Sequence, residues 1–371
     1  MATKLPTPVA KALRVIFSGL SRLWNETKIS IFAVLFGLLV GAIIVLTIGR
    51  SPVDVFRAVY SSSFGSLQGF FETMAYVAPL ILTGLAIAFA FRCGLFNIGA
   101  EGQVIVGMFV SGFIGFTWPD LPTIILLPSA ILGGAVAGAI WAGIPGLLKA
   151  KLGVHEVVNT IMMNHIAFYL VNWLVSGPYK ASGVQGTDAV PANIRLTRLS
   201  DIFGTSAADG HTGIFIALAA AFICWFLLWR TTTGFEVRAT GLNPHAAEYA
   251  GISVAKNILL AMLISGLFAG LAGGIQTLGV RGRVLQMSAF PNLGFNGIAV
   301  ALIGKNHPLG VIFGALLFGV LLRADAAIQI QADVPRQVVA IIQASVIFFV
   351  AAEQIFHWLF IRRKKEVVVN D

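Results

Sequence analysis

The sequence is short of charge and of cysteine. Asp, Glu, Lys and Arg make up 11% of the 371 residues, whereas about a quarter of an average soluble domain is charged. This composition excludes an ordinary soluble enzyme. The only two cysteines, Cys93 and Cys224, lie in or beside apolar runs, so they indicate neither a disulfide framework nor a metal site.

Motifs for metal, phosphate and nucleic acid are also missing. His155 and His165 are not at the four-residue spacing of two metal ligands on one helix, so we assign no metal and no catalytic residue. A phosphate loop ending at Lys305 fails, because Asn306 replaces the required Ser or Thr and Ala299 replaces the first glycine. The net charge of +9 comes from dispersed basic residues rather than a basic stripe. We therefore expect no nucleic-acid partner and no cofactor, ATP included, bound by this chain.

Apolar residues dominate instead, at 57% of the chain, and 40 glycines accompany them. About 20 apolar residues in a helix cross about 30 Å of hydrocarbon. Ten candidate runs cover residues 29–49, 72–91, 95–116, 123–148, 157–176, 213–229, 257–278, 290–303, 308–322 and 337–361. We predict an all-α polytopic membrane protein with one transmembrane domain over residues 29–361. The eighth run is too short for an ordinary span, so it is either a short or a re-entrant helix.

The basic residues between the runs predict the orientation. If the amino terminus is cytoplasmic, most of the 25 Lys and Arg residues fall on the cytoplasmic side, as the positive-inside rule requires. Both termini are then cytoplasmic, as a segment 1–28 and a tail 362–371. A polar loop 177–212 faces outward as a docking surface or a connector, and a loop 230–256 faces the cytoplasm. Arg281 and Arg283, placed outside, fit this orientation least well.

Glycines at four-residue spacing predict close helix contacts. Gly266, Gly270 and Gly274 share one face of the seventh run, and Gly134 and Gly138 repeat the spacing in the fourth. Small residues allow helices in a membrane to approach closely.

Polar residues inside the apolar runs are the candidate residues of a solute pathway. An unpaired amide or carboxylate is costly in a membrane, so each needs a partner. Amides can recognise hydroxyls and base edges, and a phenylalanine ring offers a stacking face, although buried amides also commonly join helices. The candidates are Asn97, Glu101, Gln103, Asn159, Asn164, Gln276, Phe295 and Asn296.

Two features of this set leave alternatives open. Glu101 either orders the turn around it or lies in the pathway. Residues 96–100 (FNIGA) and 295–299 (FNGIA) echo one another. Paired broken helices in the two halves of a transporter often flank its site, but an echo of five residues also arises by chance.

Four segments carry a resemblance to a known family. Residues 92–103, 155–164, 238–243 and 294–304 resemble permease subunits of bacterial ATP-binding-cassette importers for nucleosides and simple sugars, in the ribose/branched-chain amino acid permease superfamily. The extended amino terminus and the loop 177–212 resemble the longer of the two paired permeases of the nucleoside branch.

The resemblance implies a pore-forming subunit of the bacterial cytoplasmic (inner) membrane. Its implied partners are a cytoplasmic ATPase that uses the ATP, a second, paralogous permease and an extracytoplasmic solute-binding protein, often a lipoprotein. The implied solute is a nucleoside, with a ribose-like sugar as the alternative. An ion-coupled secondary transporter would carry more deep acids and histidines than Glu101, His165 and Glu353. An intramembrane enzyme would need a zinc-binding helix or paired aspartates, which the runs lack.

The loop 230–256 contains a predicted short helix. Asn243 can cap its start, Pro244 suits its first position and Gly251 suits a left-handed end. Its low-relief face of alanines and the charge of Glu248 are suited to a groove on a partner, and the resemblance places the ATPase-contacting helix here; an ordinary connector is the alternative. The alanines are Ala246, Ala247 and Ala250.

Overall fold

The computed structural model describes residues 32–204 and 209–352. The predicted segments 1–28 and 362–371, and Glu353, lie outside these residues. The chain divides into two compact units, a larger one of residues 56–331 and a smaller one whose described parts are residues 32–55 and 332–352. Regular structure in the described residues is helical, beside two isolated β-bridges.

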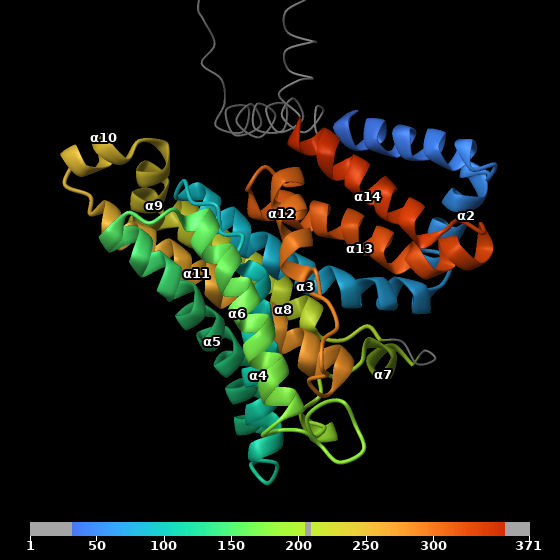
Figure 1. Ribbon diagram of the computed structural model, residues 1–371, viewed down its shortest axis with the longest axis horizontal. Helices are drawn as coiled ribbons and strands as arrows, with labels where there is room; N and C mark the ends of the chain where they lie inside the picture. Colours follow the sequence, from blue (N-terminus) through green and yellow to red (C-terminus); the bar gives the residue numbers. More distant parts are fainter. Residues whose placement is uncertain (1–31, 205–208, 353–371) are drawn as a thin grey trace, which may run out of the picture. The chain divides into compact units, whose positions relative to one another are not determined.

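The larger unit is a bundle of helices, most of which are joined by short connections (Figure 1). Helix α2 (Pro52–Ser63) leads into it. It contains α3 (Leu67–Arg92), α4 (Ala100–Thr117), α5 (Thr123–Leu152), α6 (Glu156–Ser176), α7 (Leu199–Phe203), α8 (Gly213–Arg230), α9 (Thr232–Leu242), α10 (Pro244–Tyr249), α11 (Val254–Ile275), α12 (Leu293–Ile303) and α13 (Pro308–Gln331). A 3-10 turn (Ala192–Ile194) lies in the loop before α7, and a π-helical turn (Gln276–Arg281) extends α11.

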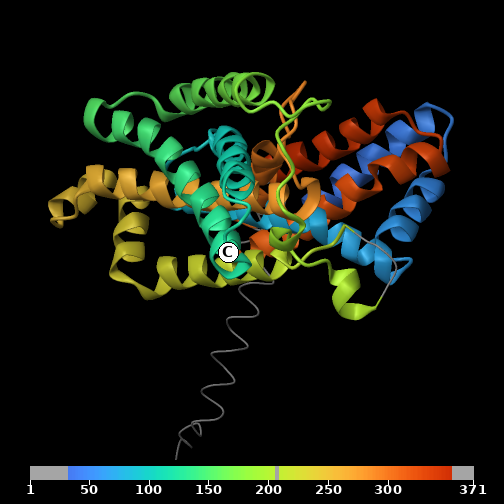
Figure 2. The ribbon, with the colours of Figure 1, turned by 90° about the horizontal axis from the view of Figure 1, so that it is seen from below.

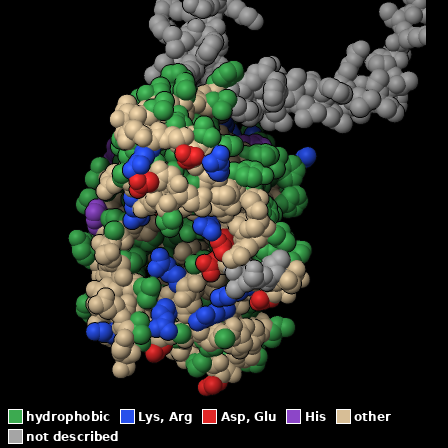
Figure 3. Space-filling view, turned by 90° about the vertical axis from the view of Figure 1, so that its right-hand side faces the viewer, with side chains coloured by type: hydrophobic (Ala, Val, Ile, Leu, Met, Phe, Trp, Pro, Cys, Tyr) green, Lys and Arg blue, Asp and Glu red, His purple; other side chains and the backbone are tan. Residues whose placement is uncertain are grey.

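Six of these helices are long and apolar enough to cross a membrane: α3, α4, α5, α8, α11 with its π-helical turn, and α13. They coincide with six of the ten predicted runs, and α6 coincides with a seventh. Helix α12 has 11 residues, which confirms that the eighth run is short. The number of crossings and the sides of the two termini stay predictions. Exposed apolar side chains are numerous on these helices, and Figure 3 shows hydrophobic side chains between scattered charged groups on one face.

The smaller unit contains the helix Phe32–Thr47 and α14 (Arg336–Ala351). The two helices touch at glycines: a Cβ on Gly37 would lie 2.6 Å from the Cα of Val346. Arg50 and Asp333 form an ion pair at the end of this unit.

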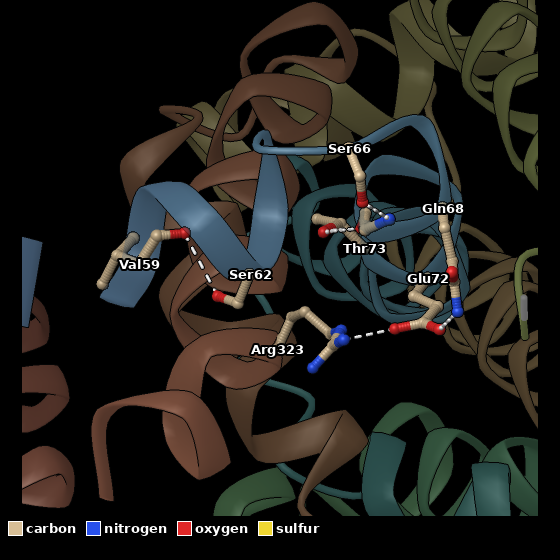
Figure 4. Close-up of polar contacts among 8 residues, drawn as sticks. Val59, Ser62, Ser66, Gln68, Glu72, Thr73 and Arg323 are labelled. Atoms are coloured by element: carbon tan, nitrogen blue, oxygen red, sulfur yellow. Dashed lines mark hydrogen bonds and ion pairs between the residues drawn. The ribbon is translucent and has the colours of Figure 1, made fainter. Parts of the chain in front are cut away.

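A polar cluster joins the start of α3 to α13 (Figure 4). The Ser66 hydroxyl accepts the backbone N–H of Gly69 at 3.0 Å and so caps α3. One turn later, Glu72 forms an ion pair with Arg323 of α13 and accepts a hydrogen bond from Gln68 at 3.1 Å. Because both charges are half-buried, their pairing offsets part of the cost of placing them among apolar helices.

The predicted glycine contacts are confirmed for four of the five positions. Helix α11 packs against α4 and α5. A Cβ on Gly138 would lie 2.6 Å from the Cα of Gly270, and one on Gly270 would lie 2.9 Å from the Cα of Gly138. Gly134 and Gly266 make comparably close backbone approaches. Gly274 does not, because a Cβ there would meet Ser111 at an ordinary 3.4 Å.

We expect Gly270→Ala to lower the free energy of unfolding by about 1–3 kcal/mol, because the added methyl group has only rigid backbone to displace. Gly143→Ala is the control, since its Cβ would meet only the flexible end of the Leu263 side chain, at 3.0 Å. The thermal unfolding midpoint of the detergent-solubilised protein measures both effects. Equal midpoints for the two variants would contradict the contact.

The loop 177–212 folds back on the chain that follows α11. The backbone N–H groups of Thr187, Val190 and Leu196 donate to the carbonyls of Val284, Gly282 and Leu278, at 2.9, 2.9 and 3.1 Å. This part of the loop is therefore an ordered cover over residues 278–286, rather than a loose connector.

His211 closes this loop and is buried, at 1% exposed. Its Nδ1 accepts the N–H of Gly213 at 3.2 Å, and its Nε2 has no hydrogen-bond partner among the described residues. Because burial disfavours the charged ring, it lowers the pKa of His211 to about 4.

The low pKa of His211 predicts a loss of stability in mild acid. In the unfolded chain the His211 ring binds a proton near pH 6.5, which is above its pKa in the folded protein. The contribution of the neutral ring to the free energy of unfolding is therefore complete above pH 6.5 and falls between about pH 6.5 and 4. The loss is up to about 3 kcal/mol over that window. The variant His211→Gln should flatten this part of the pH profile of the unfolding midpoint. An unchanged slope in the variant would contradict a buried neutral ring.

Candidate functional site

Helix α12 is the short element around which the polar residues gather. It contacts α3, α4 and α13 and lies among them in both ribbon views (Figures 1 and 2). At about 1.5 Å per residue it is about 16 Å long, half the thickness of a hydrocarbon core. Lys305 and Asn306, at φ angles of 51° and 53°, turn the chain sharply into α13.

Glu101, at the start of α4, holds the amino-terminal end of α12. One carboxylate oxygen accepts the N–H of Asn292 at 2.6 Å, and the other accepts those of Gly294 at 2.6 Å and Phe295 at 3.2 Å. Helices leave their first N–H groups unsatisfied, and a carboxylate there also complements the helix dipole. Glu101 is 0% exposed, so this geometry favours its role in ordering the turn over direct contact with a solute.

Asn97 and Gln103 form a buried amide pair. Asn97 Nδ2 donates to Gln103 Oε1 at 3.0 Å, and Gln103 Nε2 donates back to Asn97 Oδ1 at 3.1 Å. Asn97 Nδ2 also donates to the hydroxyl of Ser265 at 2.8 Å, which in turn donates to the carbonyl of Ala86 at 2.6 Å. This network joins α3, the turn before α4, and α11. Both amides are buried and join helices, and their part in the pathway stays a prediction.

The two asparagines of α6 differ from one another. Asn164 is buried and ties α6 to the same turn, since its Oδ1 accepts the N–H of Gly102 at 2.8 Å and its Nδ2 donates to the carbonyl of Ile98 at 3.0 Å. Asn159 is half-buried, and its Nδ2 has no hydrogen-bond partner among the described residues. Asn164 thus joins helices in this structure, and the part of both asparagines in the pathway stays a prediction.

Phe295 and Asn296 are the candidates on α12 itself, and both are half-buried. The ring of Phe295 meets that of Phe290 edge to face, with centroids 5.8 Å apart. The ring centroid of Phe290 also lies 4.9 Å from that of Phe168 and 5.3 Å from that of His165, both on α6. His165 is exposed.

Gln276 is the candidate that lies apart, at the start of the π-helical turn after α11, where it is half-buried.

Sequence reasoning missed Phe290 and Asn172. The amide of Asn172 holds both the N–H and the carbonyl of Met287, at 2.8 and 3.0 Å, and so fastens the segment before α12 to α6. The position of Asn172, a polar residue inside the fifth apolar run, could have indicated a buried contact. Nothing in the neighbouring sequence indicated that its partner is Met287.

The short helix of the loop 230–256 forms as predicted. The Asn243 side chain accepts the N–H of Ala246 at 3.1 Å, Pro244 opens α10, and Gly251 follows it at a φ of 81°. Ala246, Glu248 and Ala250 are exposed, but Ala247 is buried against its own chain. Ala247 therefore does not belong to an outward face, which corrects the predicted set.

Together these features define a multi-pass helical membrane protein with a short, internally capped helix at its centre. Residues 69–351 match the family described as branched-chain amino acid transport system / permease component. The guanosine ABC transporter permease protein NupP of Bacillus subtilis is 42% identical over 92% of this chain and 98% of its own.

Two further relatives are similar over much of their length. The glucose ABC transporter permease protein TsgB13 of Haloferax volcanii is 33% identical, over 90% of this chain and 89% of its own. The guanosine ABC transporter permease protein NupQ of Bacillus subtilis is 31% identical, over 67% and 78%. The chain belongs to this family of transport-system permease components, which confirms the resemblance of its four segments.

Burial separates the roles of the two asparagines in the echoed segments. Asn97→Ala leaves the Gln103 amide without its partner in the interior and removes the donor to the Ser265 hydroxyl, so we expect a loss of stability of about 1–3 kcal/mol. Asn296→Ala removes a half-buried amide from α12, so we expect a normal unfolding midpoint and reduced uptake. Unfolding in detergent and uptake per folded molecule measure the two effects. A normal midpoint with reduced uptake for Asn97→Ala would return Asn97 to the pathway.

Proposed function

We propose that the chain is one of two permease subunits that together form the pathway for a nucleoside in an ATP-driven importer. The observation that carries this proposal is the 42% identity to a guanosine permease over nearly the whole of both chains. The occurrence of two similar guanosine permease proteins, NupP and NupQ, in Bacillus subtilis supports a second, paralogous permease as partner.

The remaining partners follow from the same proposal. A cytoplasmic ATPase supplies the ATP chemistry, a solute-binding protein or lipoprotein delivers the nucleoside, and the complex lies in the bacterial cytoplasmic membrane. Both termini and α10 face the cytoplasm. The exposed Ala246, Glu248 and Ala250 of α10 contact the ATPase, and Asn243, Pro244 and Gly251 hold the helix in shape for that contact.

The geometry at α12 favours a neutral solute. The amino-terminal ends of half-helices in transporters often bind anionic groups of the substrate. Here the Glu101 carboxylate already accepts the N–H groups of Asn292, Gly294 and Phe295, so an anion would find neither donors nor a favourable charge. A nucleoside suits this site, whereas a nucleotide with a phosphate does not.

The half-buried residues of α12 favour a solute with an aromatic base. Phe295 and Phe290 present ring edges and faces beside the amide of Asn296, and His165 extends the aromatic set. Rings of this kind stack on a base, and an amide pairs with its donors and acceptors. A simple sugar is the second candidate, because the glucose permease TsgB13 is similar over a comparable length.

Uptake by the complete transporter tests the proposal. In cells that express the chain with its neighbouring transporter genes, we expect labelled guanosine to accumulate. Excess unlabelled nucleoside should suppress this uptake, whereas guanosine monophosphate, ribose and glucose should not. Phe295→Ala should reduce guanosine uptake several-fold, since one aromatic contact contributes about 0.5–1.5 kcal/mol. Phe222→Ala is the control, because Phe222 is 65% exposed on α8 and outside this site. Uptake of glucose and not guanosine would replace the nucleoside by a sugar.

A further inference from the structure

One segment of ten residues holds both ends of α12. Glu101, at the end of this segment, accepts the amino-terminal N–H groups of α12. Arg92, at its beginning, holds the opposite end: its Nε donates to the carbonyl of Asn306 at 2.9 Å and its Nη2 to that of Lys305 at 3.1 Å. Residues 92–101 run from the last residue of α3 to the second residue of α4, so one short segment contacts both ends of a helix about 200 positions later in the chain.

The charges of this clamp match the helix they hold. An α-helix carries a partial positive charge at its amino-terminal end and a partial negative charge at its carboxyl-terminal end. The anion Glu101 meets the first end and the cation Arg92 meets the turn after the second. Gly294 adds a backbone contact, since a Cβ there would lie 2.6 Å from the Cα of Glu101. Helix α12 is therefore tied to residues 92–101 by charge, hydrogen bonds and shape together.

The same segment touches the short helices of the loop 230–256. A Cβ on Gly241, in the last turn of α9, would lie 2.8 Å from the carbonyl carbon of Cys93. Gly94, at a φ of 76°, lies against the backbone of Gly241 from the other side of this contact. A Cβ on Gly94 would lie 3.3 Å from the Cα of Gly241. Backbone that meets backbone in this way has no flexible side chain to absorb a displacement.

A shared tryptophan makes a second connection between the segment and α9. The guanidinium carbon of Arg92 lies 5.3 Å from the centroid of the Trp229 ring, and that of Arg238, on α9, lies 5.9 Å from it. Both distances are within the range of a cation–π contact. Helix α9 also contacts α10, from which only Asn243 separates it. A continuous set of contacts thus runs from α10 through α9 to both ends of α12.

We propose that residues 92–101 are the link that passes movement of α9 and α10 to α12. The proposal rests on the function proposed above, in which α10 contacts the ATPase. Movement of α10 displaces Gly241, Gly241 displaces the backbone at Cys93 and Gly94, and Arg92 and Glu101 carry α12 with them. Arg92, Glu101 and Gly241 are positioning residues that act on the solute through Phe295 and Asn296.

The experiment follows α12 in the assembled transporter, with its ATPase, second permease and binding protein in proteoliposomes. Ile298→Cys serves as the reporter, because Ile298 is half-buried on α12 and both native cysteines are buried. The thiol-labelling rate is measured with and without ATP, beside guanosine uptake per ATP hydrolysed. In the reporter background we expect ATP to change the labelling rate at least threefold.

Arg92→Gln removes the cation from the carboxyl-terminal end of α12. We expect the ATP-dependent change in labelling to disappear and uptake per ATP hydrolysed to fall at least tenfold. Arg92→Lys should restore part of both, because lysine keeps the charge but not the two-bond contact. A residue that only stabilised the fold would lower uptake and ATP hydrolysis together and leave their ratio unchanged.

Two further variants complete the design. Gly241→Ala tests the link at α9 if the Arg92→Gln transporter fails to assemble. We expect it to lose the ATP-dependent change in labelling and the uptake per ATP hydrolysed as Arg92→Gln does. Arg230→Gln is the matched control, because the guanidinium of Arg230 lies over the ring of Trp225, at 5.2 Å, and not over Trp229, which Arg92 contacts. It should keep both the labelling change and the uptake ratio.

The outcomes separate the link from the proposed function. If ATP changes the labelling in the reporter background and still does so in Arg92→Gln or Gly241→Ala, the link is wrong and the function stands. If guanosine uptake depends on ATP but labelling never changes, α12 does not move and the link is again wrong. If the complete transporter shows no ATP-dependent guanosine uptake, the proposed function fails, and the link fails with it.

Discussion

The hydrogen bonds of Glu101 to the start of α12 are the interaction on which the centre of this protein depends. A helix too short to cross the hydrocarbon exposes unsatisfied backbone groups at a depth where no water can satisfy them. A buried carboxylate alone would be equally costly. Each group resolves the problem of the other: three N–H donors surround the carboxylate, and the carboxylate completes the helix. Removing either partner leaves the other unsatisfied in the interior.

This arrangement requires α4 to be held firmly, and the glycine contacts provide that support. Gly107 of α4 meets α11 at Gly270, so the two backbones approach without intervening side chains. The amide pair of Asn97 and Gln103, with Ser265 of α11, then fixes the turn from which α4 begins. Close packing and buried hydrogen bonds thus position Glu101 from two sides, which gives it a defined geometry despite its cost.

Local features could be predicted from the sequence, and distant pairings could not. Six long helices, the short eighth segment, the glycine contacts and the cap of α10 all follow from hydropathy, spacing or capping residues within a few positions. Nothing near Glu101 indicates that its partners lie about 190 positions later, and nothing near Asn97 indicates that its amide is fully engaged. Such contacts depend on how the helices pack, which a single sequence does not encode in any short pattern.

The echo of residues 96–100 and 295–299 gains a physical context from the packing. A Cβ on Gly294, next to the second segment, would lie 2.7 Å from the carbonyl carbon of Ala100, the last residue of the first. The two segments therefore meet where α4 and α12 begin, and each supplies small residues to a contact that larger ones would block. Phe295 and Asn296, in the first turn of α12, are half-buried, whereas Glu101 is fully buried against the backbone N–H groups of the same turn. Glu101 is thus engaged in holding α12, and the amides of Asn97 and Gln103 are engaged with one another. In the pathway proposed above, the ring of Phe295 and the amide of Asn296 are then the groups left for a solute, and such a pair suits neutral, flat molecules as a class.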